Sequence, residues 1–365
     1  MRLRVGAALV ALMIGVGLLV APGVALASQR VCRIGGKHLT ELSGMVATSG
    51  GFVVVNDGSD DPAARKIFYL NGRCAVTRTV SYPSRPRDTE DMGLAPGGTL
   101  WVADIGDNNR NRPTIGLWRL PPGSSHPRLY RLAYPDGPHD AEALLFDGDG
   151  TPIVVTKTIG TAGIYEPAGD LAAKATTPMR KVGEVALPIT ATDNPFSIAG
   201  RLLITGGAVS PDGGHVVLRT YADAFEFPVT RGDVVGAITH GEPRQIPMPD
   251  EPQGESVAYT PDGTALVTVS ETSRQPAGTK ADILRYALPP RPAVTTSPAA
   301  APATSSAVTT GTAAAPAGGP GVAQAAKSAV RRAGTPAGLL ITGGVLLLGL
   351  AALLGILLAR RSVRR

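Results

Sequence analysis

Residues 90–104 read EDMGLAPGGTLWVAD, and this stretch decides the fold. It begins with an acidic head, continues as a short apolar run to a Pro-Gly-Gly turn, and returns as a second apolar run that ends in an acid. Two short apolar runs joined by a glycine-rich turn predict a β-hairpin.

The same pattern recurs along the chain, at residues 43–57, 142–156, 205–219 and 255–271. The five heads stand at positions 43, 90, 142, 205 and 255, so their spacings are 47, 52, 63 and 50 residues. Two further apolar runs follow most of the hairpins. A repeat of about 50 residues with four strands is typical of a propeller blade.

The fold class predicted from this repeat is all-β, with a five-bladed β-propeller over residues 28–290. Residues 30–34 supply the missing outer strand of the last blade and close the ring without a long free edge. The 63-residue interval leaves room for a sixth blade. An open sandwich is the alternative, in which the periodicity would be a coincidence.

The first 27 residues have the pattern of a signal peptide. Arg2 and Arg4 precede an apolar run, and the small-x-small sequence at 25–27 predicts cleavage after Ala27. An uncleaved N-terminal span is the alternative.

The C-terminal end has the pattern of a membrane anchor. Gly338–Ala359 is a 22-residue stretch without charge, and as a helix it would be about 33 Å long, enough to cross the hydrocarbon core. Residues 360–365 are basic and predict a cytoplasmic tail. We therefore expect a single-pass protein of the cell membrane, held through Gly338 to Ala359, with its N-terminal ectodomain outside.

Residues 291–336 consist mainly of Ala, Pro, Thr, Ser and Gly and contain no acid. This composition predicts a disordered linker between the ectodomain and the membrane.

The positive charge of the chain lies at its two ends. Ten of the 35 basic residues fall in 1–27 and 291–365, which contain no acid, so residues 28–290 hold 25 basic residues against all 29 acids, a net of −4. A mildly acidic globular part argues against binding to a phosphate backbone, and no nucleic-acid partner is expected.

Cys32 and Cys74 are the only cysteines. In an exported domain they are expected to form a disulfide that fastens the ring closure, with two separate buried thiols as the alternative.

Acidic residues recur at the ends of the inner strands. In a propeller these ends surround one mouth of the central channel, so acids far apart in sequence become neighbours. The set comprises the heads Glu90, Glu142 and Glu255, with Glu41 before the first head, Asp57, Asp104 and Glu271 at the ends of second strands, and Asp107 just beyond.

Such carboxylates repel one another unless a hard cation such as Ca²⁺ or nearby arginines offset their charge. In the alternative interpretation, the acids only cap backbone N–H groups or pair with arginine to hold the blades together. The chain contains no Gly-x-Ser-x-Gly elbow, no His-Glu-x-x-His and no phosphate-cradling loop.

Residues 90–104 and 255–271 resemble the blade motif of calcium-dependent β-propeller phytases and phytase-like esterases. They are also similar to the Glu-Gly-x motif of gluconolactonase-type propellers. The resemblance implies that head glutamates and strand-end acids bind a channel metal, which makes Glu90, Asp104, Glu142 and Glu255 the candidate ligands. The fourth repeat departs from the motif, with Thr205 at its head. The composition and spacer resemble those of actinobacterial membrane-anchored envelope proteins.

Two functions follow as hypotheses. The first is a membrane-tethered extracytoplasmic propeller that binds a ligand or a protein, with Ca²⁺ at its acidic mouth. The second is a metal-dependent hydrolase of phosphoesters, esters or lactones that uses the same mouth.

Overall fold

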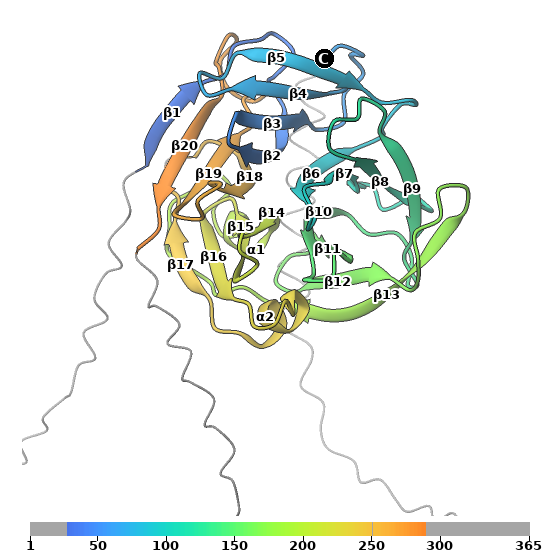
Figure 1. Cartoon of the computed structure of the whole chain (residues 1–365). Coiled ribbons are helices and arrows are strands. Elements are labelled where there is room, and N and C mark those ends of the chain that lie inside the picture. Colours follow the sequence, from blue (N-terminus) through green and yellow to red (C-terminus); the bar gives the residue numbers. More distant parts are fainter. Residues whose placement is uncertain (1–27, 250, 290–365) are drawn as a thin grey trace, which may run out of the picture. The chain divides into compact units, whose positions relative to one another are not determined.

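The computed structural model of the chain describes residues 28–249 and 251–289 (Figure 1). Regular structure in this part is almost entirely β, and the two helices, α1 (Ala199–Leu202) and α2 (Val234–His240), are short. The all-β prediction is confirmed.

Consecutive strands pair antiparallel in units of four. The strands are β1 (Gln29–Arg33), β2 (Leu42–Thr48), β3 (Gly51–Asn56), β4 (Lys66–Asn71), β5 (Val76–Ser81), β6 (Thr89–Leu94), β7 (Leu100–Asp104), β8 (Ile115–Leu120), β9 (Arg128–Ala133), β10 (Ala141–Phe146), β11 (Pro152–Thr156), β12 (Ala162–Pro167), β13 (Thr176–Val185), β14 (Ile204–Val209), β15 (His215–Thr220), β16 (Asp223–Pro228), β17 (Arg244–Pro247), β18 (Gly254–Tyr259), β19 (Ala265–Ser270) and β20 (Asp282–Ala287).

The units surround one axis in a propeller-like arrangement. Their first strands, β2, β6, β10, β14 and β18, lie in sequence around the axis, and β18 returns to β2 (Figure 1). The ring is closed by β1, which pairs antiparallel with β20 and so completes the sheet β18-β19-β20-β1. The strand predicted over residues 30–34 therefore has the expected partner.

The second and third units are joined into one eight-stranded sheet. β13 is ten residues long, and its first residues, Thr176–Pro178, pair in parallel with β9 while the rest pairs with β12. The start of β13 at Thr176 leaves no local pattern in the sequence, because it depends on a parallel pairing with a distant strand.

The 63-residue interval between the third and fourth heads holds β10 to β13, a loop and α1. In the described chain no strand lies between Val185 and Ile204.

Apolar side chains fill the spaces between neighbouring units in five clusters, for example Met45, Val54 and Val267 between the first and last units. Burial of this apolar surface is the main stabilising force of the fold.

Polar groups bind the inner strands to one another near the axis. The fully buried Asp91 carboxylate accepts hydrogen bonds from the backbone N–H groups of Met92, Leu144 and Gly207, and so connects β6, β10 and β14. Ser43 Oγ donates to the Glu90 carbonyl at 2.6 Å, and Thr205 Oγ1 donates to the Gly254 carbonyl at 2.9 Å. These bonds fix the relative height of the strand heads.

Cys32 and Cys74 form a disulfide in the structure, with their Cα atoms 5.8 Å apart. Cys32 lies in β1 of the last unit, and Cys74 follows β4 of the first unit. The bond therefore spans the closure of the ring.

The predicted signal peptide (1–27), linker (291–336), membrane span (338–359) and basic tail (360–365) lie outside the described residues. Within residues 28–249 and 251–289, no helix has the length and apolar character needed to cross a membrane.

Candidate functional site

Acidic side chains gather at one end of the inner strands, where the structure brings together three of the four candidate ligands, Glu90, Glu142 and Glu255. The buried Glu90 carboxyl interacts electrostatically with Glu142, and Glu142 with Glu255. We call this cluster the acidic mouth; it comprises Glu41, Asp57, Asp88, Glu90, Asp140, Glu142, Glu255 and Glu271.

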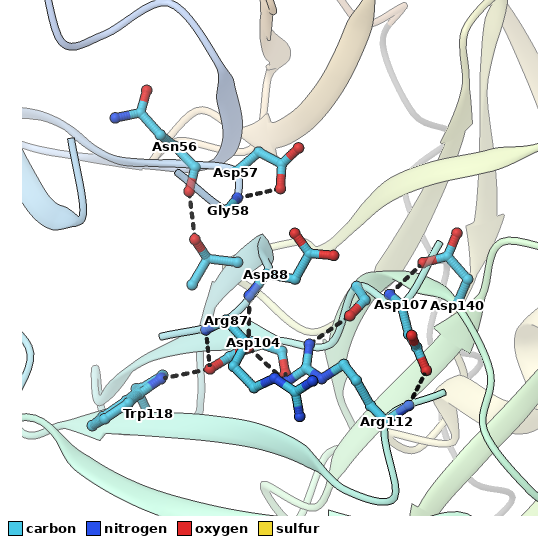
Figure 2. Close-up of polar contacts among 12 residues, drawn as sticks. Asn56, Asp57, Gly58, Arg87, Asp88, Asp104, Asp107, Arg112, Trp118 and Asp140 are labelled. Carbon is cyan, nitrogen blue, oxygen red and sulfur yellow. Dashed lines mark hydrogen bonds and ion pairs between the residues drawn. The ribbon is translucent and has the colours of Figure 1, made fainter. Parts of the chain in front are cut away.

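The tightest part of the acidic mouth consists of Asp57, Asp88 and Glu90. One carboxylate oxygen from each of these residues lies within 4.8 Å of the other two. Asp57 follows β3, Asp88 precedes β6 and Glu90 is the second residue of β6, so two neighbouring units contribute. Figure 2 shows Asp57 and Asp88 on their adjoining loops. We call these three residues the carboxylate triad.

Two glycines make room for the carboxylate triad. A Cβ atom at Gly106 would overlap Glu90 Oε1 and lie 2.6 Å from Asp88 Oδ2, and one at Gly58 would overlap Asp88 Oδ1. Neither glycine has a positive φ. The space itself, and not an unusual backbone conformation, therefore requires glycine at both positions.

The electrostatics of the carboxylate triad call for a positive charge. Burial, followed by the Asp88 carboxylate, raises the pKa of Asp57 to about 9. Burial, followed by Glu142 and Asp57, raises the pKa of Glu90 well above its usual range. Three oxygen ligands at this spacing fit a hard divalent cation, which would neutralise the repulsion and restore the ionised forms.

Lys157 lies among the residues of the acidic mouth that are outside the carboxylate triad. Lys157 Nζ forms an ion pair with Glu142 Oε1 at 2.5 Å and lies 5.5 Å from the centre of the Tyr221 ring. Burial lowers the pKa of Lys157, but Glu142 and Glu255 raise it more, so the net direction is upward. The neighbouring glutamates therefore favour the cationic form of Lys157, which is not the form that acts as a nucleophile.

The side-chain amide of Gln253 forms hydrogen bonds to both Glu255 and Glu271. Gln253 Nε2 donates to Glu255 Oε1 at 3.1 Å and also to Glu271 Oε2. Tyr221 Oη donates to the same Glu255 oxygen at 3.2 Å. Burial, followed by Glu255 and Glu41, raises the pKa of Glu271 to about 7, a value suited to exchanging protons near neutral pH.

Asp104, the fourth candidate ligand, is not part of the carboxylate triad and has a different set of partners (Figure 2). Its Oδ1 accepts from the Asp88 N–H at 3.0 Å and from Arg112 Nη2 at 2.7 Å. Its Oδ2 accepts from the Arg87 N–H at 3.1 Å and from Trp118 Nε1 at 3.4 Å. Both oxygens are occupied, so Asp104 holds the loop that presents Asp88.

Asp107 is likewise part of the loop framework. Its Oδ2 accepts from the Arg112 N–H at 2.7 Å, and its own N–H donates to Asp140 Oδ1 at 2.8 Å (Figure 2). This arrangement matches the alternative in which acids cap backbone groups and pair with arginine.

Sequence reasoning did not identify Asp88, Asp140, Tyr221 and Gln253 as site residues. A signal for three of them was present in the repeat. Asp88, Asp140 and Gln253 each stand two residues before a head glutamate, as Glu41 stands before Ser43. Alternate residues of a strand share a face, so the polar pair at each head extends the mouth outward.

No family model and no curated protein sequence matches the chain. Among solved structures, a gluconolactonase from Xanthomonas campestris is 15% identical with a TM-score of 0.41, covering 68% of this chain and 73% of that chain. A PQQ-bound aldose sugar dehydrogenase from Streptomyces coelicolor is 10% identical with a TM-score of 0.39, covering 71% and 98%. A luciferin-regenerating enzyme is 14% identical with a TM-score of 0.40, covering 68% and 78%.

A gluconolactonase is thus one of the structural neighbours. At these identities and TM-scores the likeness is one of fold alone, and the functional argument rests on the acidic mouth.

Proposed function

We propose that this protein is a membrane-tethered extracytoplasmic propeller whose acidic mouth holds a divalent cation and binds a ligand or a partner protein. The observation that carries the proposal is the carboxylate triad, in which Asp57, Asp88 and Glu90 place three oxygens within 4.8 Å of one another. Ca²⁺ is the expected ion, because it prefers several carboxylate and carbonyl oxygens in a flexible arrangement.

The surroundings of the carboxylate triad support this assignment. Gly58 and Gly106 leave the space that the three carboxylates occupy, and Asp104 fixes the loop by accepting hydrogen bonds from the backbone N–H groups of Arg87 and Asp88. Lys157 pairs with Glu142 and so leaves the carboxylate triad without a bonded counter-ion of its own among the described residues.

The architecture is part of the proposal. We count five blades, because five four-stranded units surround the axis and β1 completes the last one. The signal peptide at 1–27 and the span at 338–359 place the ectodomain outside the cell and the basic tail inside. Protease added to intact cells should then remove the ectodomain and leave a C-terminal epitope tag protected; protection of both ends would contradict this topology.

Thermal unfolding of the full-length chain tests cation binding. A ligand that binds only the folded state at about 100 times its Kd stabilises it by about 2.7 kcal/mol. We expect Ca²⁺ to raise the Tm of the wild-type protein, and Asp88→Asn to remove most of that increase. Equal increases in the wild-type protein and Asp88→Asn would contradict the assignment.

A second candidate function is hydrolysis of an ester or lactone. The observation that favours it is Glu271, whose pKa of about 7 suits a general base. In this case Ca²⁺-dependent turnover of ester substrates should be lost in Glu271→Gln while Ca²⁺ binding persists. Turnover that is unaffected by Glu271→Gln would rule out this role for Glu271.

A further inference from the structure

Three buried acceptor atoms lie in the half of the acidic mouth that the cation does not use. Glu142 Oε2, Gln253 Oε1 and Glu255 Oε2 have no hydrogen-bond partner. Their residues are only 2%, 7% and 4% exposed. A buried acceptor without a partner is costly, so three of them in one cluster point to a missing donor.

The other polar atoms of these side chains are already in use. Glu142 Oε1 is paired with Lys157, and Glu255 Oε1 accepts from Tyr221 and Gln253. The amide nitrogen of Gln253 faces two carboxylates, Glu255 and Glu271, which fixes its orientation and leaves the carbonyl oxygen as the free atom. The free atoms are therefore all acceptors, and a ligand must bring the donors.

These atoms belong to two glutamates and one glutamine, none of which is part of the carboxylate triad. In the part of the chain that the structure describes, the only acidic group close enough to hold one ion is the carboxylate triad. The four carboxylates of the other half, Glu41, Glu142, Glu255 and Glu271, act electrostatically on Lys157 or on one another. A second positive charge would improve this balance.

Aromatic side chains lie beside these acceptors, namely the buried Tyr221, which donates to Glu255 Oε1, and the half-buried Phe196. The Tyr221 ring packs against Phe196 with the ring centroids 4.3 Å apart. Phe196 belongs to the loop between β13 and α1, which also exposes Ile189 and Ile198 at 68% and 60%. The Arg274 guanidinium lies 5.8 Å from the centre of the Phe196 ring.

We propose that this half of the acidic mouth binds the primary ammonium group of a small organic amine whose apolar body lies against Phe196 and Tyr221. A primary ammonium brings three N–H donors, as many as there are free acceptors, and its charge offsets the surplus of carboxylates. This inference rests on the proposed function of the mouth as a binding site, but it uses residues outside the carboxylate triad.

Hydroxyl groups can also donate to the three acceptors, and a neutral polar ligand is the competing explanation. The charge of the ligand distinguishes the two explanations. A neutral ligand leaves Lys157 as the only cation that balances these carboxylates, whereas an ammonium adds a second positive charge. An amine and an alcohol of the same length therefore form a decisive pair of probes.

The test is calorimetric titration of the full-length chain with hexylammonium and with hexan-1-ol, at pH 7 and constant ionic strength, with EDTA or with Ca²⁺. We expect one hexylammonium per chain, bound at least roughly tenfold more tightly than hexan-1-ol, since hydrogen bonds to charged groups exceed neutral ones. Equal affinities, or no binding of hexylammonium by the folded protein, would overturn the proposal.

Two variants locate the site. Glu255→Gln keeps a carbonyl oxygen for Tyr221 but turns the free acceptor into a donor, so it should weaken hexylammonium binding by roughly tenfold. Phe196→Ala should weaken hexylammonium but leave methylammonium unchanged, and it keeps the test valid if Glu255→Gln fails to fold. Glu184→Gln, on the exposed end of β13, is the matched control without effect.

Asp88→Asn separates this inference from the proposed cation site. It should lose Ca²⁺ binding and still bind hexylammonium. Amine binding without any Ca²⁺ binding in the wild-type protein would overturn the cation site alone. Ca²⁺ binding without a preference for the amine over the alcohol would overturn the amine site alone.

Discussion

Asp88 precedes β6 and Asp104 ends the neighbouring strand β7, and the surroundings of the two carboxylates give them different roles. Both Asp104 oxygens accept hydrogen bonds from Arg112, Trp118 and two backbone N–H groups. Asp88 lies instead against Asp57 and Glu90. The residue whose hydrogen-bonding capacity is used up is structural, and the one surrounded by like charges is available to a cation.

Gly106 offers a direct test of the space inside the carboxylate triad. Gly106→Ala places a methyl group against Glu90 Oε1 and Asp88 Oδ2, so we expect Ca²⁺ affinity to fall at least roughly tenfold through displaced ligands. Gly169→Ala is the matched control, because a Cβ atom there meets nothing within 4 Å. Equal Ca²⁺ affinities of the two variants by calorimetry would refute the role of Gly106.

Glu271 predicts a pH dependence of stability. Its pKa is about 7 in the folded protein against an ordinary value of 4.5, so the folded state binds the proton more tightly than the unfolded state does. The stability associated with this proton is complete below about pH 4.5 and is lost as the pH rises through 7.

Comparison with Glu271→Gln isolates that contribution. Between pH 4.5 and pH 8 and without Ca²⁺, wild-type stability should fall relative to the variant by up to about 3 kcal/mol. Urea unfolding at each pH measures the difference, and Glu184→Gln controls for the loss of an exposed carboxylate. A constant difference between the wild-type protein and Glu271→Gln across this range would contradict the shifted pKa.

Among the secondary-structure elements, β1 has the most distant partner in sequence. It pairs with β20, and its Arg33 side chain donates to both carboxylate oxygens of Asp282 at 2.7 and 3.0 Å. The disulfide from Cys32 to Cys74 then ties β1 to the first unit across a sequence separation of 42 residues.

Removal of the disulfide should therefore weaken the closure of the ring. In the chain-entropy model, opening a loop of this length costs about 4 kcal/mol. We expect the double variant Cys32→Ser/Cys74→Ser to unfold at lower urea concentration, and reduction of the wild-type protein to give the same shift. Stability that does not change in either case would show that strand pairing alone maintains the closure.

The hairpins were predictable from sequence because the information in them is local. Each apolar run and each Asp-Gly or Gly-Gly turn lies within about 15 residues, as in residues 90–104. The early start of β13 at Thr176 was not predictable, since it depends on pairing with β9, more than 40 residues earlier in the chain.

On the scale of the whole molecule, the rotational repeat explains which site residues the sequence could reveal. It implied that Glu90, Glu142 and Glu255 converge, because equivalent heads meet around one axis. It did not distinguish Asp104 from Asp57, which occupy equivalent strand ends. Their different roles depend on Arg112 and Trp118, whose approach to Asp104 is set by packing within one unit.

We propose that Asp57 and Asp88, which come from two different units of the ring, bind one cation together with Glu90. Calorimetric titration of the EDTA-treated full-length chain with Ca²⁺ tests this directly. The variant is Asp88→Asn, and the control is Asp149→Asn, which changes a surface aspartate outside the mouth. We expect one Ca²⁺ per chain for the wild-type protein and for Asp149→Asn, and an affinity at least roughly tenfold lower for Asp88→Asn. No Ca²⁺ binding by the wild-type protein, or equal affinity in all three proteins, would contradict it.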